Sequence, residues 1–450
     1  MNLLGKFPQI HIKVFVLIFL ASCQSIDNID LQLEIAEFDT TVKYKKISIP
    51  CSTVYLDSLR TDGNENMIVG NNNDDVSGSI NVIPFANVSY NSGYTADTDT
   101  LDIIDSSLHL DVQNIISNKD ADSVYFELEI AKCTENVLST VIYTHVDSFE
   151  VFEKPLDTLR FWVQSDGGMV KVPITSQLAS ALWGNLISDN TTSAENIYCI
   201  KLKPLKNDGL LSIDCINNNT YFELVHDDGS DITDLEYTYM KIVDFFHHVN
   251  RDRSESLIEP LVNTGDFLSE TSFSYISNLA GTLVKFDLSE LISFVETLPD
   301  NTIIDHSEFT IGMSPDHTNP ISSNMDNLIM YFFQTDIVIN GPLAYNNRRS
   351  QIMGAENQYR GGLTQLRVFD FNSPNGQFKE DITFFVQTYL DVYYEDIDYP
   401  TSALVAVPSE QLTPEEAEKA IPTNQMSLDR AKIINEEVYI EIYYTTLAEQ

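Results

Sequence analysis

The chain has 450 residues, and its 67 acidic against 26 basic side chains give a formal net charge of −41 at neutral pH. This excess of negative charge argues against nucleic acid or an anionic membrane surface as a partner, because both would repel the protein. The apolar fraction of 43% is ordinary for a globular protein and excludes a disordered acidic tail. A chain of this length predicts two or three domains.

The N-terminus has the pattern of a bacterial lipoprotein signal. Lys6 and Lys13 form a positive region before the apolar run 14–19, which is shorter than the roughly 20 residues of a membrane-spanning helix and suits a signal peptide. Leu-Ala-Ser-Cys follows at positions 20–23. We expect residues 1–22 to be removed as a signal peptide and Cys23 to carry several acyl chains. The alternative is an ordinary cleaved signal peptide in which this cysteine is incidental.

Strand patterns dominate the rest of the chain. Helical patterns are few and short; they begin at Ser176, near Asp287 and at Thr413, and Gly184 is expected to end the first of them. The overall pattern predicts a mainly β fold with two β-sandwich or jelly-roll-like modules and a few short helices. Alternating or continuous runs of β-branched and aromatic residues predict strands at 125–130, 158–163, 200–203, 328–333, 382–386 and 438–444.

The order of strand, short helix, strand and proline occurs twice, once around 172–204 and again around 286–315. This recurrence indicates two related modules. We therefore expect an acidic tether at 23–37, a first β-sandwich module at 38–250 and a second at 267–450.

Four cysteines follow the lipidation position, and an oxidising compartment would permit disulfides among them. Cys199 and Cys215 lie symmetrically about Asn207, so a hairpin there would place them opposite each other and within reach of a bridge. The other interpretation is two buried thiols that act as small apolar side chains.

Catalytic and metal-binding patterns are weak. His247 and His248 are adjacent, and neighbours in an extended chain point to opposite faces, so they make a poor chelating pair. The oxygen-rich stretches 62–66, 71–75 and 227–231 lack the spacing of a calcium loop and are interpreted as solvated turns. HExxH, Gly-x-Ser-x-Gly and P-loop spacings do not occur in the sequence. We therefore predict no catalytic residues, no metal site and no cofactor.

The order of motifs after the N-terminal signal resembles a known family. The motif at 38–41 precedes a strand at 54–61, a Met-Ile-Val-Gly motif at 67–70 and an Asn/Asp-rich loop, and a second block lies at 279–288. This order is similar to that of the Bacteroidota lipoproteins of the domain-of-unknown-function 4270 family. The resemblance implies a surface or outer-membrane lipoprotein without a family-wide activity, so no catalytic residues carry over.

The anchor, the β-rich modules and the lack of catalytic spacing lead to one expectation. The chain is a non-enzymatic outer-membrane lipoprotein that faces the cell exterior and acts as an interaction subunit of a β-barrel insertion, secretion or uptake machine. Its expected partners are an outer-membrane β-barrel protein, other surface lipoproteins, or both. The alternative is a glycan-binding accessory lipoprotein of a polysaccharide-utilisation system. For that role Trp162 and Trp183 are expected in the core, which leaves the 21 tyrosines as the available aromatic residues.

Overall fold

The structure is a computed structural model that describes residues 41–447 with interruptions. Cys23, the expected signal peptide 1–22, the tether 23–37 and the helix expected at Thr413 lie outside the described residues. Besides breaks of five residues or fewer, the interruptions are 91–101, 188–197, 228–234, 315–326, 334–366, 391–402 and 410–427.

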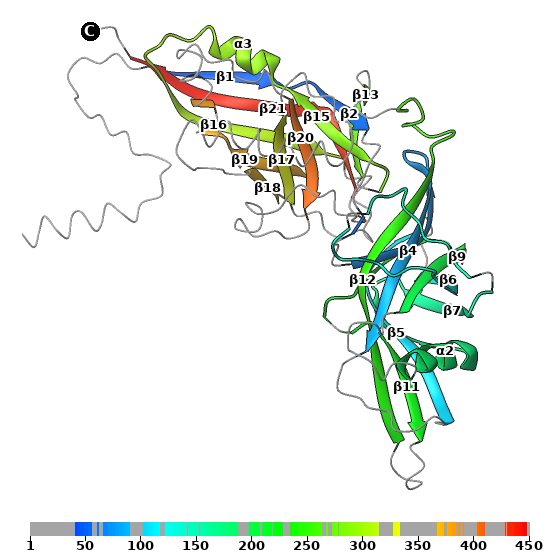
Figure 1. Cartoon of the computed structure of the whole chain (residues 1–450). Coiled ribbons are helices and arrows are strands. Elements are labelled where there is room, and N and C mark those ends of the chain that lie inside the picture. Colours follow the sequence, from blue (N-terminus) through cyan, green and yellow to red (C-terminus); the bar gives the residue numbers. More distant parts are fainter. Residues whose placement is uncertain are drawn as a thin grey trace, which may run out of the picture.

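The described strands form two antiparallel sheets, which confirms the mainly β fold expected from the sequence. Figure 1 shows them as two elongated bodies that meet at an angle. The first body, here called the C-terminal sheet, contains β1 (Val42–Ser48), β2 (Cys51–Tyr55), β13 (Phe267–Leu268), β14 (Phe273–Ser277), β15 (Thr282–Asp287), β16 (Thr302–Met313), β17 (Asn327–Phe333), β18 (Arg367–Asn372), β19 (Gln377–Asp381), β20 (Ala403–Ser409) and β21 (Arg430–Thr446).

The strand order of the C-terminal sheet is β1-β21-β16-β19-β18-β17-β20-β15-β2-β13, and β14 pairs with β15 and β21. The long strand β21 therefore pairs with three others, and its pairing with β1 joins the two ends of the described chain.

The second body is a ten-stranded sheet, here called the inserted sheet. Its order is β12-β11-β5-β10-β3-β4-β9-β6-β7, β8 pairs with β5, and β12 also pairs with β4, so the path returns on itself. The strands are β3 (Asn66–Asp74), β4 (Gly78–Tyr90), β5 (Asp102–Ser117), β6 (Ser123–Lys132), β7 (Asp157–Gln164), β8 (Gly168–Pro173), β9 (Tyr198–Asn207), β10 (Gly209–Asp214), β11 (Tyr221–Asp227) and β12 (Leu235–Asp252).

The sheets divide the chain differently from the expected modules 38–250 and 267–450. Strands β1 and β2 pair with β21 and β15, so they belong to the C-terminal sheet, and the inserted sheet lies in the chain between β2 and β13. Pairing of this kind joins residues nearly 400 positions apart, such as Val42 and Thr445. Local alternation identifies a strand but not its partner, which explains the difference.

One short helix packs against each sheet. In the inserted sheet, α2 (Ser176–Ile187) buries Leu178, Leu182 and Trp183 in a core that also holds Phe126 and Phe222. In the C-terminal sheet, α3 (Ser289–Val295) buries its leucine and valine against the core residues of β16 and β21. Both helices follow a strand and precede another, as the sequence recurrence indicated, but the flanking strands pair with different neighbours in the two sheets.

Two local expectations differ from the structure. The expected strand 382–386 contains a helical turn, in which the Val386 N–H donates to the Ile382 carbonyl at 3.0 Å. Gly184, expected to end the first helix, lies inside α2. In both places the apolar residues pack into a core, and tertiary packing overrides local propensity.

Gly70 is required by the close approach of β3 to β10. Its φ of +134° is a conformation that residues with a side chain rarely adopt. A Cβ atom at this position would lie 2.2 Å from the Gly209 carbonyl oxygen, and both glycines belong to the paired strands. The Met-Ile-Val-Gly motif at 67–70 therefore has a structural explanation in this chain.

The two sheets meet at a joint with an apolar centre. Tyr55, Leu279 and Leu428 from the C-terminal sheet share one buried cluster with Ile68 and Val249 from the inserted sheet. The Arg251 Nε donates to the Leu279 carbonyl at 2.7 Å across the same boundary. Burial of these side chains holds the two bodies together.

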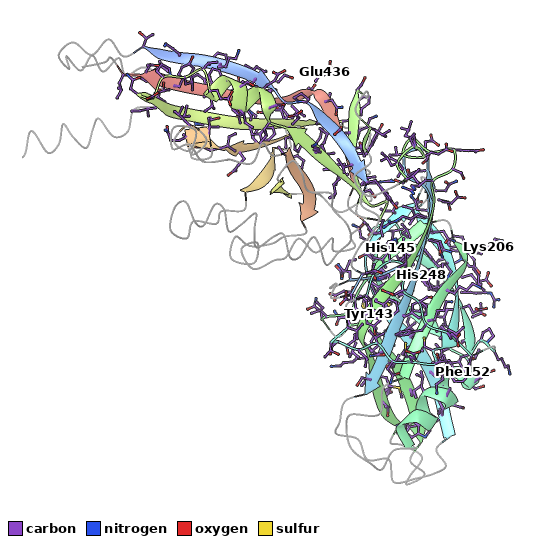
Figure 2. All side chains as sticks on the ribbon, turned by 45° about the horizontal axis from the view of Figure 1, so that its top comes forward. Tyr143, His145, Phe152, Lys206, His248 and Glu436 are labelled. Atoms are coloured by element: carbon purple, nitrogen blue, oxygen red, sulfur yellow. The ribbon has the colours of Figure 1, made fainter. Side chains whose placement is uncertain are left out.

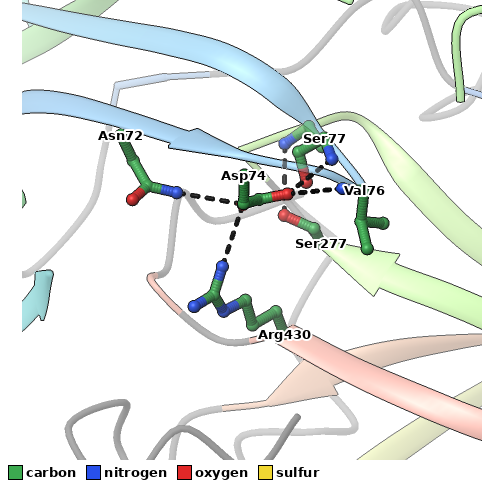
Figure 3. A network of polar contacts seen from close by, with 7 residues as sticks. Asn72, Asp74, Val76, Ser77, Ser277 and Arg430 are labelled. Carbon is green, nitrogen blue, oxygen red and sulfur yellow. Dashed lines mark hydrogen bonds and ion pairs between the residues drawn. The ribbon is translucent and has the colours of Figure 1, made fainter. Parts of the chain in front are cut away.

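A polar network flanks the apolar centre (Figure 3). The Asp74 Oδ2 accepts from Arg430 of β21 at 2.9 Å and from Asn72 at 3.0 Å. The Asp74 Oδ1 accepts from the backbone N–H groups of Val76 and Ser77, which shapes the turn between β3 and β4. The Asp74 carboxylate therefore fixes a turn of the inserted sheet and also binds the Arg430 guanidinium group of the C-terminal sheet.

We expect the Asp74→Ala variant to lose about 2 kcal/mol of unfolding free energy, because a partly buried ion pair and two turn hydrogen bonds are removed together. Asp74→Asn keeps an acceptor for the turn and should lose about half as much. Urea unfolding measures both. The control is Glu127→Gln, which removes an ion pair to the largely exposed Arg160 and should cost less than about 1 kcal/mol. Equal losses of unfolding free energy for Asp74→Ala and the control would contradict the stabilising role of Asp74 in the joint.

Candidate binding surfaces

Trp162 lies on the outer face of the edge strand β7, and it is 61% exposed. The expectation that it belongs to the core is wrong, whereas Trp183, at 5% exposed, is in the core as expected. The reason lies in the strand alternation, since Phe161 and Val163 fill the core and the residue between them must face outward. The sequence could have indicated the exposure of Trp162, because the apolar residues on either side of it mark the core face of the strand.

Two further side chains extend the surface around Trp162. The Tyr125 ring lies 5.2 Å from the Trp162 ring between centroids, and the two residues are cross-strand partners. The Arg160 Nε donates to the Glu127 carboxylate at 2.9 Å, and a second guanidinium nitrogen also lies 2.9 Å from it. We call Tyr125, Glu127, Arg160 and Trp162 the β6–β7 surface. It combines a large exposed aromatic residue with an oriented guanidinium group.

A second polar and aromatic region lies on β5, β8, β11 and β12. Residues that alternate with the core positions of these strands face the other side, and they lie in cross-strand rows. Lys171 is opposite His109, which is opposite Tyr221, and Glu223 is opposite Tyr239. We call these five residues the aromatic–charged face.

Ring contacts organise the aromatic–charged face. The His109 and Tyr221 rings are stacked with centroids 4.5 Å apart and an angle of 13°. The Tyr239 ring stands nearly perpendicular to Tyr221 at 5.3 Å, and Tyr239 is 46% exposed. An exposed ring edge and face beside fixed charges can bind a ligand by stacking and hydrogen bonding together.

Glu223 is the fixed charge at the centre of this face. Its carboxylate accepts from the Lys171 ammonium at 2.8 Å and lies 3.4 Å from the His109 Nε2. Burial raises the pKa of Glu223, but the hydrogen bond and charge of Lys171 and the adjacent His109 outweigh burial and hold the pKa below its ordinary value. The hydrogen bond to Glu223 raises the pKa of Lys171. Both groups are therefore charged at neutral pH.

His247 and His248 do not act as a pair in the structure. His247 is fully buried: its Nε2 accepts from the Ile68 N–H at 2.8 Å, and its Nδ1 donates to the Thr61 carbonyl at 3.0 Å. The Nδ1 of His248, on the opposite face of β12, lies 3.2 Å from the Asp147 carbonyl oxygen. Among the described residues, no group of three or more His, Cys, Asp or Glu side chains is placed to hold a metal ion.

The oxygen-rich stretches have different outcomes. In 71–75 the Asp74 carboxylate shapes a turn, as interpreted from the sequence, and also contributes to the joint. Most of 62–66 and of 227–231 lies outside the described residues.

The hairpin expected to join Cys199 and Cys215 does not form. Strand β9, which carries Cys199, pairs with β4 and β6, whereas β10, which precedes Cys215, pairs with β3 and β5. Both residues are free thiols in the structure, Cys199 being buried and Cys215 half-buried. A short polar link between two apolar runs suggested a hairpin, but each run found its partner elsewhere in the sheet.

No protein-family model matches the chain, and no curated protein shows significant sequence similarity to it. Within the part of the chain that the structure describes, none of the helices has the length and apolar character needed to cross a bilayer.

Burial lowers the pKa of His247 from its ordinary value of 6.5 to about 4. The unfolded chain therefore takes up a proton below pH 6.5 while the folded chain does not, so stability falls as the pH drops from 6.5 to 4. We expect this histidine to contribute a loss of about 3 kcal/mol over that interval.

The comparison variant is His247→Gln, which cannot take up the proton. Urea unfolding at pH 7 and pH 4 should show that the unfolding free energy of this variant depends less on pH than that of the wild type. The matched control, His248→Gln, should keep the wild-type loss. Identical pH dependence in the wild type and His247→Gln would contradict the buried neutral imidazole.

Proposed function

We propose that the protein is a non-enzymatic outer-membrane lipoprotein, anchored through Cys23 and facing the cell exterior, that acts as an interaction subunit of an outer-membrane protein assembly. Its partner is an outer-membrane β-barrel protein or another surface lipoprotein. The proposal also places the chain among the Bacteroidota lipoproteins of the domain-of-unknown-function 4270 family. The observation that carries it is the β6–β7 surface on the inserted sheet.

The composition of the β6–β7 surface supports protein binding. Tryptophan, tyrosine and arginine are the residues in which the binding energy of protein interfaces is concentrated. Trp162, Tyr125 and Arg160 lie together on two paired strands at a sheet edge. The guanidinium group of Arg160 is oriented by Glu127 before any partner arrives, which lowers the entropy cost of ordering it on binding.

The arrangement of the two bodies supports an anchored role. Strand β1 begins at Val42 opposite Thr445, at the end of the C-terminal sheet that is far from the joint (Figure 1). The chain between Cys23 and Val42 can span at most about 65 Å when fully extended. An anchor at Cys23 would hold the C-terminal sheet near the membrane and leave the inserted sheet to extend from it.

Affinity purification from solubilised outer membranes tests this function. The wild type should be recovered with partners in stoichiometric amounts, and Trp162→Ala should weaken that association about tenfold or more, as loss of a central aromatic contact does. The matched control is Ile303→Ala, which removes an exposed apolar side chain from the C-terminal sheet and should retain the partners. Recovery of the wild type alone would contradict the function.

A second candidate function, glycan binding, is favoured by the aromatic–charged face. The exposed Tyr239 ring offers a stacking surface, and the Glu223 and Lys171 charges offer an acceptor and donors for hydroxyl groups. This face uses residues of β5, β8, β11 and β12, and none of them belongs to the β6–β7 surface. The two functions are therefore separable by mutation.

A glycan array with the soluble body tests the second function. If it is correct, Tyr239→Ala should lose at least tenfold in affinity for any glycan that the wild type binds, because one stacking platform is removed. Tyr44→Ala, which removes a tyrosine of similar exposure from β1, is the control and should bind as the wild type does. Absence of wild-type binding across the array, or equal loss in both variants, would contradict glycan binding at this face.

A further inference from the structure

Two buried cysteines lie opposite each other in the inserted sheet, and they are not the pair expected from the sequence. The register of β6 against β9 pairs Ala131 with Lys201 and Lys132 with Ile200, so the next position pairs Cys133 with Cys199. The Cys133 N–H donates to the Cys199 carbonyl at 2.9 Å. The two residues are therefore direct cross-strand partners in an antiparallel ladder.

This position suits a disulfide. The Cα atoms of a hydrogen-bonded antiparallel pair are about 5.5 Å apart, within the roughly 4.4–6.8 Å that disulfides span. Side chains of directly opposite residues point to the same face of a sheet. Cys133 and Cys199 belong to one buried cluster with Phe85, Tyr143 and Phe246, so both thiols face the same apolar space.

The thiols also contact each other. A hydrogen bond with the Cys133 side chain, followed by burial, raises the pKa of the Cys199 thiol. The other two described cysteines have different surroundings: burial raises the pKa of Cys51 to about 11, against a hydrogen bond with Ser274, and raises that of Cys215 to about 12. Neither of them lies opposite a cysteine.

We propose that Cys133 and Cys199 form a disulfide in the protein of the cell envelope, an inference that rests on the proposed location in an oxidising compartment. The two thiols lose their protons and two electrons and form one S–S bond. The electrons and protons pass to an oxidant that contains a disulfide, and the S–S bond of that oxidant is reduced to two thiols. Because thiolate is the reactive form, the bond forms while the sheet assembles, before burial removes both sulfurs from water.

The disulfide would hold in place the segment that leaves the sheet after β6. After β6 the chain runs over β12 and returns at Val151, which forms a bridge with Cys133. Along this path the His145 carbonyl accepts from the Val249 N–H at 2.8 Å, and the Tyr143 ring stacks on Phe246 at 4.2 Å. Figure 2 shows Tyr143 and His145 in the part of the inserted sheet that also carries His248. A link between Cys133 and Cys199 would join the base of this segment to β9.

The test is peptide mapping of the full-length protein purified from its native envelope, alkylated during denaturation without reductant. Cys133 and Cys199 should appear as one linked peptide pair, while Cys51 and Cys215 should be alkylated. The same spectrum reports whether the peptide that begins at Cys23 is acylated. In parallel, reduced protein refolded with oxidised and reduced glutathione should form the same bond. Free Cys133 and Cys199 in both samples would overturn the pairing.

Two double variants keep the proposal falsifiable through stability. A reductant should lower the unfolding temperature of the oxidised wild type and of Cys51→Ser/Cys215→Ser, and should leave that of Cys133→Ser/Cys199→Ser unchanged. A bond that forms on refolding but is absent from the protein purified from the envelope would overturn the proposal that the disulfide exists in the cell. That result would also count against the proposed location in an oxidising compartment. An acylated Cys23 with both thiols free would leave the location standing and overturn the disulfide alone.

Discussion

The whole molecule depends on one constraint, which is that the chain leaves the C-terminal sheet after β2 and must re-enter it at β13. The two crossings are brought together because Phe267 pairs with Val54 in adjacent strands. The apolar cluster around Tyr55 and the Asp74–Arg430 pair then set how the two bodies meet. His247 secures the end of the outgoing connection, since it hydrogen-bonds to the backbone of Thr61 in that connection and of Ile68 in β3.

In the proposed function, this constraint would separate the membrane attachment from the surface that binds a partner. The described chain begins and ends at the same end of the C-terminal sheet, where β1 pairs with β21, and the inserted sheet lies beyond the joint. An anchored C-terminal sheet and a projecting inserted sheet would give the β6–β7 surface access to a neighbouring protein. The geometry of the joint would then determine where the β6–β7 surface lies relative to the anchor.

Much of the strand content could be predicted from the sequence, because alternation is a local property. The runs at 125–130 and 158–163 are β6 and β7, and 438–444 lies within β21. The poor chelating geometry of His247 and His248 also followed from alternation, since neighbours in a strand face opposite sides. Trp162 shows the same rule applied incompletely: its neighbours Phe161 and Val163 mark the core face, so its exposure could have been predicted.

The sequence by itself determined a mainly β chain with few helices, and it contains the lipoprotein-type N-terminal pattern. Only the tertiary structure decided that β1 and β2 belong with the C-terminal strands, that Asp74 meets Arg430, and that Cys199 lies opposite Cys133 instead of Cys215. The physical reason is common to all three. Side-chain alternation is encoded in adjacent residues, whereas strand partners are selected by the packing of the complete sheet, which joins residues far apart in the chain.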